Sequence, residues 1–312
     1  MSNILNNKQK VIIALAVIGL ILLCVGAVMG GSLSSIPTMF SEADLPEGIQ
    51  SIDEVKTTDI RSVELNLIKS DITIKTGKSF SLSGTGLYDS YVKDGIFYAG
   101  ASDNKHSANI LGMKLKIPSK WVCGYGSYVL TIPKKANLDS ITINTSYCNI
   151  SGDLLQAKTM NISMKSGDLN LAGITADTLT LSASRGNIGI QNAQITQTGT
   201  IEAFRDVYIG NENTMKNFLG NVSVSTSLGD ISLFGTLSNK SSLTTGFGDI
   251  NTTLTGSKDK YNLNSQKGDL IIGTEVGTDI SKENLDKLTF TEGLYGDITF
   301  TCNQGKSTVH FK

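Results

Sequence analysis

Histidine, arginine and cysteine are scarce in this 312-residue chain, and each shortage argues against a class of chemistry. The two histidines, His106 and His310, and the absence of a CxxC pair leave too few ligands for a zinc cluster. The same shortage of histidine argues against a Ser/His/Asp triad. Three arginines and a formal net charge of −1 give no basic excess, so we expect no nucleic-acid partner. Neither a P-loop nor a nucleophile elbow nor a dinucleotide-binding fingerprint occurs, so we expect no cofactor.

Proline is also scarce, with 4 residues against 32 glycines. Ser, Thr, Asn, Val, Ile and Leu dominate from about Val63 onward, and this composition favours strands and turns over helices. Of the four cysteines, Cys24 lies in an apolar run, which leaves Cys123, Cys148 and Cys302. Three cysteines cannot all pair within one chain, so either one disulfide forms beside a free thiol or all three are reduced and packed.

Residues 11–30 form one continuous apolar run without a charged side chain. As a helix with a rise of about 1.5 Å per residue it would span about 30 Å, the thickness of the hydrocarbon core of a bilayer. Because signal-peptide cores are usually shorter, we interpret the run as an uncleaved signal anchor. Cleavage near Gly30 and Gly31 is the alternative, and a lipoprotein signal ending at Cys24 is disfavoured because Leu23 precedes the cysteine.

The flanking charges set the orientation of this predicted transmembrane helix. Residues 1–10 carry Lys8 and Lys10, whereas residues 31–50 carry three acids and no Lys or Arg. The positive-inside rule therefore places residues 1–10 in the cytoplasm and the C-terminal domain outside it, with the bilayer as a partner through residues 11–30. Residues 31–59, which lack a sustained period, are predicted to be a linker.

An internal repeat with a period of about 19 residues, just under the range of common solenoid repeats, runs through the rest of the chain. In one copy, Ile162 is followed after four residues by Gly167-Asp168 and then by Leu169. The glycine-equivalent positions from 148 to 296 are separated by 19, 19, 19, 24, 19, 20 and 28 residues. The Gly-Asx pairs form a predicted column of turns: Gly167 and Asp168, Gly186 and Asn187, Gly229 and Asp230, Gly248 and Asp249, Gly268 and Asp269, Gly296 and Asp297.

Apolar residues alternate with polar ones on both sides of each pair, as they do along half-buried strands. One such unit cannot bury its apolar face, but copies stacked about 4.8 Å apart build a continuous core with parallel ladders. The sequence therefore predicts an all-β, single-stranded parallel β-solenoid (β-helix) of about nine coils over residues 60–312, preceded by one transmembrane α-helix. Residues 78–135 fit the repeat poorly and are predicted to form irregular coils and a cap. Strands are expected within them at Phe80–Leu82, Ile96–Tyr98, Met113–Ile117 and Tyr128–Ile132.

The aspartates of the column admit two interpretations, an acid/base or metal site and a structural turn. Glycine adopts conformations that other residues avoid, and a neighbouring Asp or Asn bonds the local backbone. Asn149 and Asn187 occupy the aspartate position in two copies, which favours the turn. The nine-residue spacing of calcium-binding β-rolls is absent, so we expect no metal.

Two groups of residues are candidate binding surfaces. The first is an aromatic cluster that comprises Tyr88, Tyr91, Tyr98, Trp121, Tyr125 and Tyr128. Aromatic rings favour binding, although packing of the cap is the alternative role. The second is the pair Arg185 and Arg205, one period apart, which either binds an acidic group or is a solvated surface feature. Polysaccharide-cleaving β-helices need clustered carboxylates with a nearby Arg or Lys in a groove, and the chain has only three arginines, so we expect no enzyme.

The run from Leu130 to Lys135, followed by residues 141–150 and the Gly-Asp repeats, resembles a bacterial family. That family is the adhesin-like, β-strand-repeat domain of unknown function found behind an N-terminal membrane segment, and the resemblance covers about Ile60 to Lys312. It implies a right-handed β-solenoid at the cell envelope and assigns no catalytic residue. We therefore expect a non-catalytic cell-envelope binding, adhesion or structural module with an envelope protein or surface glycan as partner. The alternatives are a regulatory accessory of an envelope-stress sensor or membrane complex and a polysaccharide-active enzyme.

Overall fold

The computed structural model describes residues 40–41, 60–85, 89–100, 105–110, 113–118, 126–211, 217–273, 279–280 and 296–312. The predicted anchor, residues 11–30, lies outside these ranges, as does nearly all of the linker 31–59. In the described ranges, no helix combines the length and the apolar character needed to cross a membrane. The chain divides into two compact units, of which the first comprises 1–44 and 103–122 and the second the remainder.

The described part of the first unit is a small antiparallel sheet. It consists of β1 (Phe40–Ser41), β6 (Lys105–Ile110) and β7 (Met113–Pro118), in the order β1-β6-β7. β6 and β7 pair as a hairpin, in which Ile110 lies opposite Met113. The strand predicted at Met113–Ile117 is therefore present. It belongs to this separate sheet, however, and not to the irregular coils predicted over residues 78–135.

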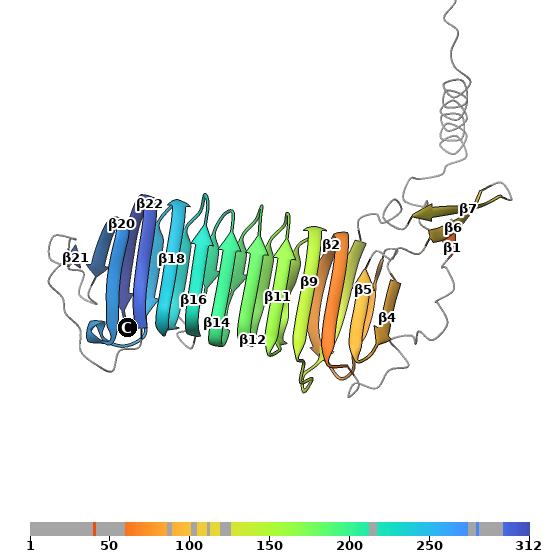
Figure 1. The fold of residues 1–312 in the computed structure, drawn as a ribbon, viewed down its shortest axis with the longest axis horizontal. Coiled ribbons are helices and arrows are strands. Elements are labelled where there is room, and N and C mark those ends of the chain that lie inside the picture. The colour runs from red at the N-terminus through yellow and green to blue at the C-terminus, as the bar shows by residue number, and fades with distance from the viewer. Residues whose placement is uncertain are drawn as a thin grey trace, which may run out of the picture. The chain divides into compact units, whose positions relative to one another are not determined.

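The second unit is a stack of coils built almost wholly from parallel strands (Figure 1). Its strands are β2 (Ser62–Gly77), β3 (Ser81–Thr85), β4 (Asp89–Lys93), β5 (Ile96–Gly100), β8 (Gly126–Pro133), β9 (Ser140–Tyr147), β10 (Ile150–Gln156), β11 (Thr159–Met164), β12 (Leu169–Ala183), β13 (Ile188–Ile190), β14 (Ala193–Ala203), β15 (Val207–Ile209), β16 (Phe218–Thr226), β17 (Ile231–Leu237), β18 (Asn239–Phe247), β19 (Ile250–Leu254), β20 (Tyr261–Gly273), β21 (Asp279–Ile280) and β22 (Gly296–Phe311). A short 3₁₀ helix, η4 (Lys258–Lys260), precedes β20.

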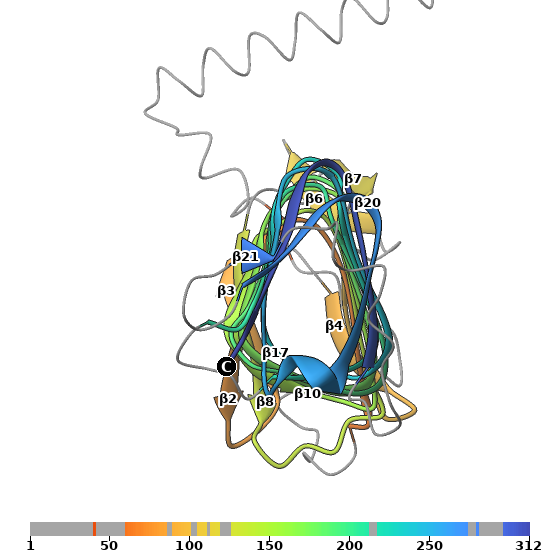
Figure 2. The same ribbon diagram turned by 90° about the vertical axis from the view of Figure 1, so that its left-hand side faces the viewer.

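Each coil has two walls that face each other across the core, as the end-on view shows (Figure 2). In one wall Ile162 pairs with Ile143 on one side and Leu181 on the other. Each partner lies one sequence period away, so that period corresponds to one full turn of the solenoid. Met160, Ile162 and Met164 are at most 1% exposed because alternate side chains point inward. The predicted all-β, parallel, solenoid-like architecture is confirmed.

The strand order departs from the chain order at both ends of the stack. β2 lies between β5 and β8 on one side and β9 and β10 on the other. Likewise β22 lies between β18 and β19 on one side and β20 on the other (Figure 1). β2, the first long strand of this unit, and β22, the last, therefore each form the second level from one end of the stack. Ten levels are present in the described residues, against about nine predicted coils.

The insertion of β22 corrects the assignment of one pair in the predicted turn column. Gly296 and Asp297 begin β22, where Gly296 pairs with Tyr261 and Asn239 in the wall. The turn of this level is made instead by Gly305 and Lys306, and Lys306 pairs with Asp269 of the outermost level. The local Gly-Asp signal was misleading because a strand is positioned by its neighbours in the stack and not by the dipeptide at its start.

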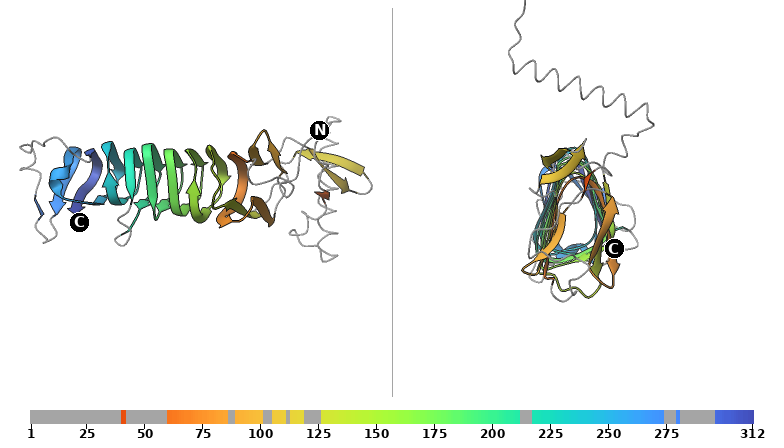
Figure 3. Two further views of the ribbon diagram at one scale, coloured as in Figure 1. Left: turned by 90° about the horizontal axis from the view of Figure 1, so that it is seen from below. Right: turned by 90° about the vertical axis from the view of Figure 1, so that its right-hand side faces the viewer.

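Antiparallel strands cover the outer level at the β2 end of the stack (Figure 3). β4 pairs with β5 and β3 pairs with β8, so both walls of that level gain a partner on the outside. The strands predicted at Phe80–Leu82, Ile96–Tyr98 and Tyr128–Ile132 correspond to β3, β5 and β8. β3 and β4 protect the edges of β8 and β5 from pairing with other chains, which is the role expected of a cap.

Cys148 and Cys302 are both free and buried. They lie six levels apart in the stack, roughly 29 Å at about 4.8 Å per level. A disulfide requires Cα atoms within about 7 Å, so these two thiols cannot pair with each other. Cys123 lies outside the described residues.

Candidate binding surfaces

The turns of the Gly-Asx column form one long edge of the solenoid, here called the Gly-Asx edge. A ladder of hydrogen bonds runs along it, in which each Asx Oδ1 accepts from a backbone N–H of the next level. The acceptors in order are Asp71, Asn149, Asp168, Asn187, Asp206, Asp230 and Asp249, and the last donor is the N–H of Lys306, with distances of 2.7–3.1 Å. Asp and Asn serve equally because only Oδ1 is used. In the described ranges, no group of His, Cys, Asp or Glu side chains is arranged to hold a metal ion.

The glycines of this edge are required chiefly by close packing between levels. A Cβ on Gly186 would lie 1.9 Å from the carbonyl oxygen of Gly167, and one on Gly229 would lie 2.3 Å from the carbonyl carbon of Arg205. Neither glycine has a positive φ. Gly167 and Gly248 combine such close contacts with φ values of 122° and 145°. The positive φ that the repeat predicted at these turns therefore holds for part of the column only.

Large apolar side chains are exposed in three successive levels of the Gly-Asx edge. Phe204 is 37% exposed, and Leu228 and Phe247 are each 52% exposed. The backbone N–H of Leu228 donates to the carbonyl of Phe204 at 2.8 Å, and that of Phe247 donates to Ser227 at 3.1 Å, so the three residues lie in adjacent levels. We call Phe204, Leu228 and Phe247 the apolar stripe. Each residue directly precedes the Gly-Asx turn or its equivalent, where its side chain faces away from the core.

Arg185 and Arg205 lie at the Phe204 end of the apolar stripe. The backbone N–H of Arg205 donates to the carbonyl of Gly186 at 3.1 Å, which places the two arginines in adjacent levels. Both are exposed. Nearby, the hydroxyl of Tyr208 donates to Asp206 at 3.2 Å. Burial raises the pKa of Tyr208, and the negative charge of Asp206 adds to this effect, so the hydroxyl stays protonated at neutral pH.

The predicted aromatic cluster does not form a single exposed surface. Tyr128 is 5% exposed and belongs to the core, where it pairs with Ile72, so its proposed place on a surface was wrong. Its position in β8 explains the burial, because alternate residues of that strand face inward. Tyr91 and Tyr98 stack on each other between β4 and β5, with ring centroids 5.0 Å apart. Tyr88, Trp121 and Tyr125 lie outside the described residues.

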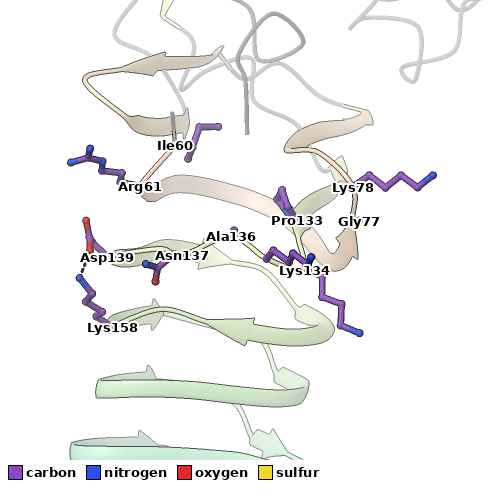
Figure 4. Close-up of a pocket in the computed structure, with 11 residues that line it drawn as sticks. Ile60, Arg61, Gly77, Lys78, Pro133, Lys134, Ala136, Asn137, Asp139 and Lys158 are labelled. Atoms are coloured by element: carbon purple, nitrogen blue, oxygen red, sulfur yellow. Dashed lines mark hydrogen bonds and ion pairs between the residues drawn. The ribbon is translucent and has the colours of Figure 1, made fainter. Parts of the chain in front are cut away.

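A pocket of about 800 Å³ opens on the opposite edge of the solenoid, at the level of β2 (Figure 4). Five cationic residues and one acidic residue line it: Arg61, Lys78, Lys134, Lys135, Lys158 and Asp139. Lys158 Nζ contacts Asp139 Oδ1 at 2.7 Å. This hydrogen bond, with the charge of Lys158, lowers the pKa of Asp139, and the same contact raises the pKa of Lys158. Sequence reasoning missed the pocket because its lining comes from two segments, 60–78 and 133–158, that are far apart in the chain.

Comparisons with known proteins identify the family of this chain. A family model described as Toastrack DUF4097 matches residues 60–293, which is more than half of the chain. The chain belongs to the Toastrack DUF4097 family. The expected adhesin-like domain of unknown function, beginning at about Ile60, is thereby confirmed.

Two solved structures are similar to this Toastrack chain. One is a candidate adhesin from Bacteroides fragilis, 13% identical, with a TM-score of 0.41, covering 81% of this chain and 92% of its own. The other is a candidate cell adhesion protein from Clostridium sporogenes, 12% identical, with a TM-score of 0.18, covering 83% of this chain and 96% of its own. No curated protein matches the chain.

Proposed function

We propose that this Toastrack protein is a non-catalytic binding module, displayed outside the cytoplasm on a membrane helix formed by residues 11–30. Its ligand is a linear glycan of the cell envelope that lies along the Gly-Asx edge. The observation that carries the proposal is the apolar stripe, with three large apolar side chains 37–52% exposed in successive levels.

The spacing of the stripe suits a repeating ligand. Adjacent levels are about 4.8 Å apart, so Phe204 and Phe247 lie on levels about 9.6 Å apart along the edge. Sugar rings have apolar faces that pack against aromatic rings, and a rigid array of rings loses little conformational entropy on binding. Arg185 and Arg205 add charged donors at one end of the stripe for hydroxyl or acidic groups of the same chain.

The hydrogen bonds of the edge support a role in binding. The carboxylates of the turns that follow the stripe residues, Asp206, Asp230 and Asp249, each accept a backbone N–H of the next level through Oδ1. They therefore hold the turns in register, which keeps the exposed rings at a fixed spacing.

Co-sedimentation with insoluble cell-wall glycan tests this function. The full chain in detergent is compared with Phe204→Ser/Phe247→Ser, and with Leu154→Ser/Phe218→Ser as a control. Leu154 and Phe218 are also exposed, at 48% and 38%, and lie outside the stripe. We expect the stripe variant to lose most of its binding and the control to keep it.

Equal sedimentation of all three proteins would contradict the proposal. So would capture of a membrane protein that depends on residues 11–30 and not on the stripe. That outcome would favour a regulatory accessory acting through its helix. Replacing residues 11–30 by an unrelated transmembrane helix separates these cases, because a displayed binding module keeps its function after the exchange.

A further inference from the structure

The pocket on the edge opposite the stripe is a consequence of the strand order. β2 begins at Ser62 and ends at Gly77. It supplies both walls of its level but not a turn that joins the two walls at this edge. The segment that runs from the end of β8 to the start of β9 passes beneath β2. Lys134 N–H donates to Gly77 at 3.3 Å, and Asp139 N–H donates to Arg61 at 2.7 Å, so this segment is tied to both ends of β2. The space left at this level is the pocket.

The charge of the pocket differs from that of the protein as a whole. The formal net charge of the chain is −1, yet five cationic side chains and one carboxylate line this single concavity. The one ion pair among the described residues here joins Lys158 to Asp139, both more than half exposed. Four cations, Arg61, Lys78, Lys134 and Lys135, have no carboxylate within ion-pair distance in the part of the chain that the structure describes.

The positions of these cations indicate an extended ligand. Figure 4 places Lys78 and Lys134 at one end of the pocket and Arg61 at the other, with Asn137 and Ala136 between. Charges spread around a rim of this size suit several linked anionic groups better than one small ion. Lysine ammonium groups bind phosphate as point charges, and the forked guanidinium of arginine matches phosphate oxygens as it does carboxylates. Four lysines and one arginine around one concavity therefore suit phosphate groups.

We infer that the pocket bounded by Arg61, Lys78 and Lys134-Lys135 binds a ligand that carries several phosphate groups. Two sources share this chemistry: a soluble or wall-borne phosphate polymer, and the headgroups of anionic lipids. The inference goes beyond the glycan-binding function proposed above and uses a different edge of the solenoid. Either can fail without the other.

Inorganic polyphosphate is the probe for this site. The full chain is reconstituted in nanodiscs of phosphatidylcholine, and its Kd for polyphosphate is measured at low ionic strength. In Lys134→Gln/Lys135→Gln we expect a Kd about 10-fold higher, because two of the unpaired charges are lost. The control Lys165→Gln/Lys240→Gln removes the same charge from exposed sites away from the pocket and should bind as the unmodified chain does.

A second set of nanodiscs, containing phosphatidylglycerol, separates the two sources. If the pocket takes lipid headgroups, these discs weaken polyphosphate binding by the unmodified chain more than by Lys134→Gln/Lys135→Gln. If it takes a polymer, both proteins are affected equally. Equal affinity of the pocket variant and the unmodified chain in phosphatidylcholine discs would overturn the inference, as would an equal loss in the Lys165→Gln/Lys240→Gln control. The Phe204→Ser/Phe247→Ser variant should bind polyphosphate normally, which keeps this test independent of the stripe.

Discussion

Asp168 Oδ1 accepts two hydrogen bonds from Asn187 in the next level, one from its backbone N–H at 2.8 Å and one from its side-chain Nδ2 at 3.0 Å. Asn187 Oδ1 in turn accepts from the N–H of Asp206. The bond from a backbone N–H to Oδ1 repeats along the Gly-Asx edge. The Asp and Asn side chains of this edge therefore form a continuous ladder of acceptors for the backbone N–H groups of successive levels.

The ladder predicts that an acceptor oxygen matters at these positions and that a charge does not. Asp230→Ala removes the Oδ1 that accepts from Asp249 N–H at 2.7 Å, and we expect a loss of about 1 kcal/mol in the free energy of unfolding. Asp230→Asn keeps the oxygen and should lie within about 0.5 kcal/mol of the unmodified chain. Denaturant midpoints measure both. Equal losses of stability in the two variants would show that the charge of Asp230, and not its acceptor oxygen, stabilises the fold.

Close packing at the turns predicts that replacing a turn glycine even by alanine strongly destabilises the fold. Gly186→Ala would place its Cβ 1.9 Å from the Gly167 carbonyl, so the backbones of two levels must separate, at a cost of at least about 2 kcal/mol. Gly173→Ala is the matched control, since the atom nearest its Cβ is the end of the exposed Leu154 side chain at 2.9 Å and its other contacts are of ordinary length. That chain can move aside. Thermal unfolding of the two variants should differ clearly, and similar melting temperatures would contradict the packing argument.

The inserted position of β22 predicts the result of a truncation. In a chain that ends at Tyr295, β20 loses its parallel partner in the stack, because β22 separates it from β18 and β19. Hydrogen exchange should then show unprotected amides throughout β20, while β11 to β16 keep their protection. A β20 that stays protected would mean that it stacks directly on β18 and β19.

Burial of Cys148 predicts a pH-dependent reactivity. Burial, together with the charge of Asp71, raises the pKa of the Cys148 thiol to about 12. The reactive thiolate is therefore rare in the folded chain at pH 8, and iodoacetamide should modify Cys148 only after unfolding. Because the folded pKa lies above the unfolded value near 9, the stabilisation is present below pH 9 and is lost between pH 9 and about 12. Rapid modification at pH 8, detected by mass spectrometry, would contradict this account.

The sequence was sufficient to predict the repeat, and with it the parallel stack, because each coil carries its own alternation of apolar residues around a Gly-Asx turn. It was not sufficient to place β2 and β22, since their positions depend on pairing between distant strands. Gly305-Lys306 lacks the Asx that marks the other turns, and Gly296-Asp297 imitates it. The apolar stripe could have been predicted from the sequence. Phe204, Leu228 and Phe247 each precede the glycine position of the repeat, so an alignment of the copies places them in one column. The pocket could not have been predicted, because it forms only where β2 is inserted between the levels of β8 and β9.

Photo-cross-linking in cells tests the proposed binding function most directly. A photoreactive phenylalanine analogue replaces Leu228 at the centre of the stripe, and a second protein carries it at Leu154 as a control, both sites being about half exposed. The account predicts a heterogeneous, glycanase-sensitive adduct at Leu228 and none at Leu154. A discrete protein adduct at Leu228 that resists glycanase would contradict the glycan ligand and identify the stripe as a protein interface.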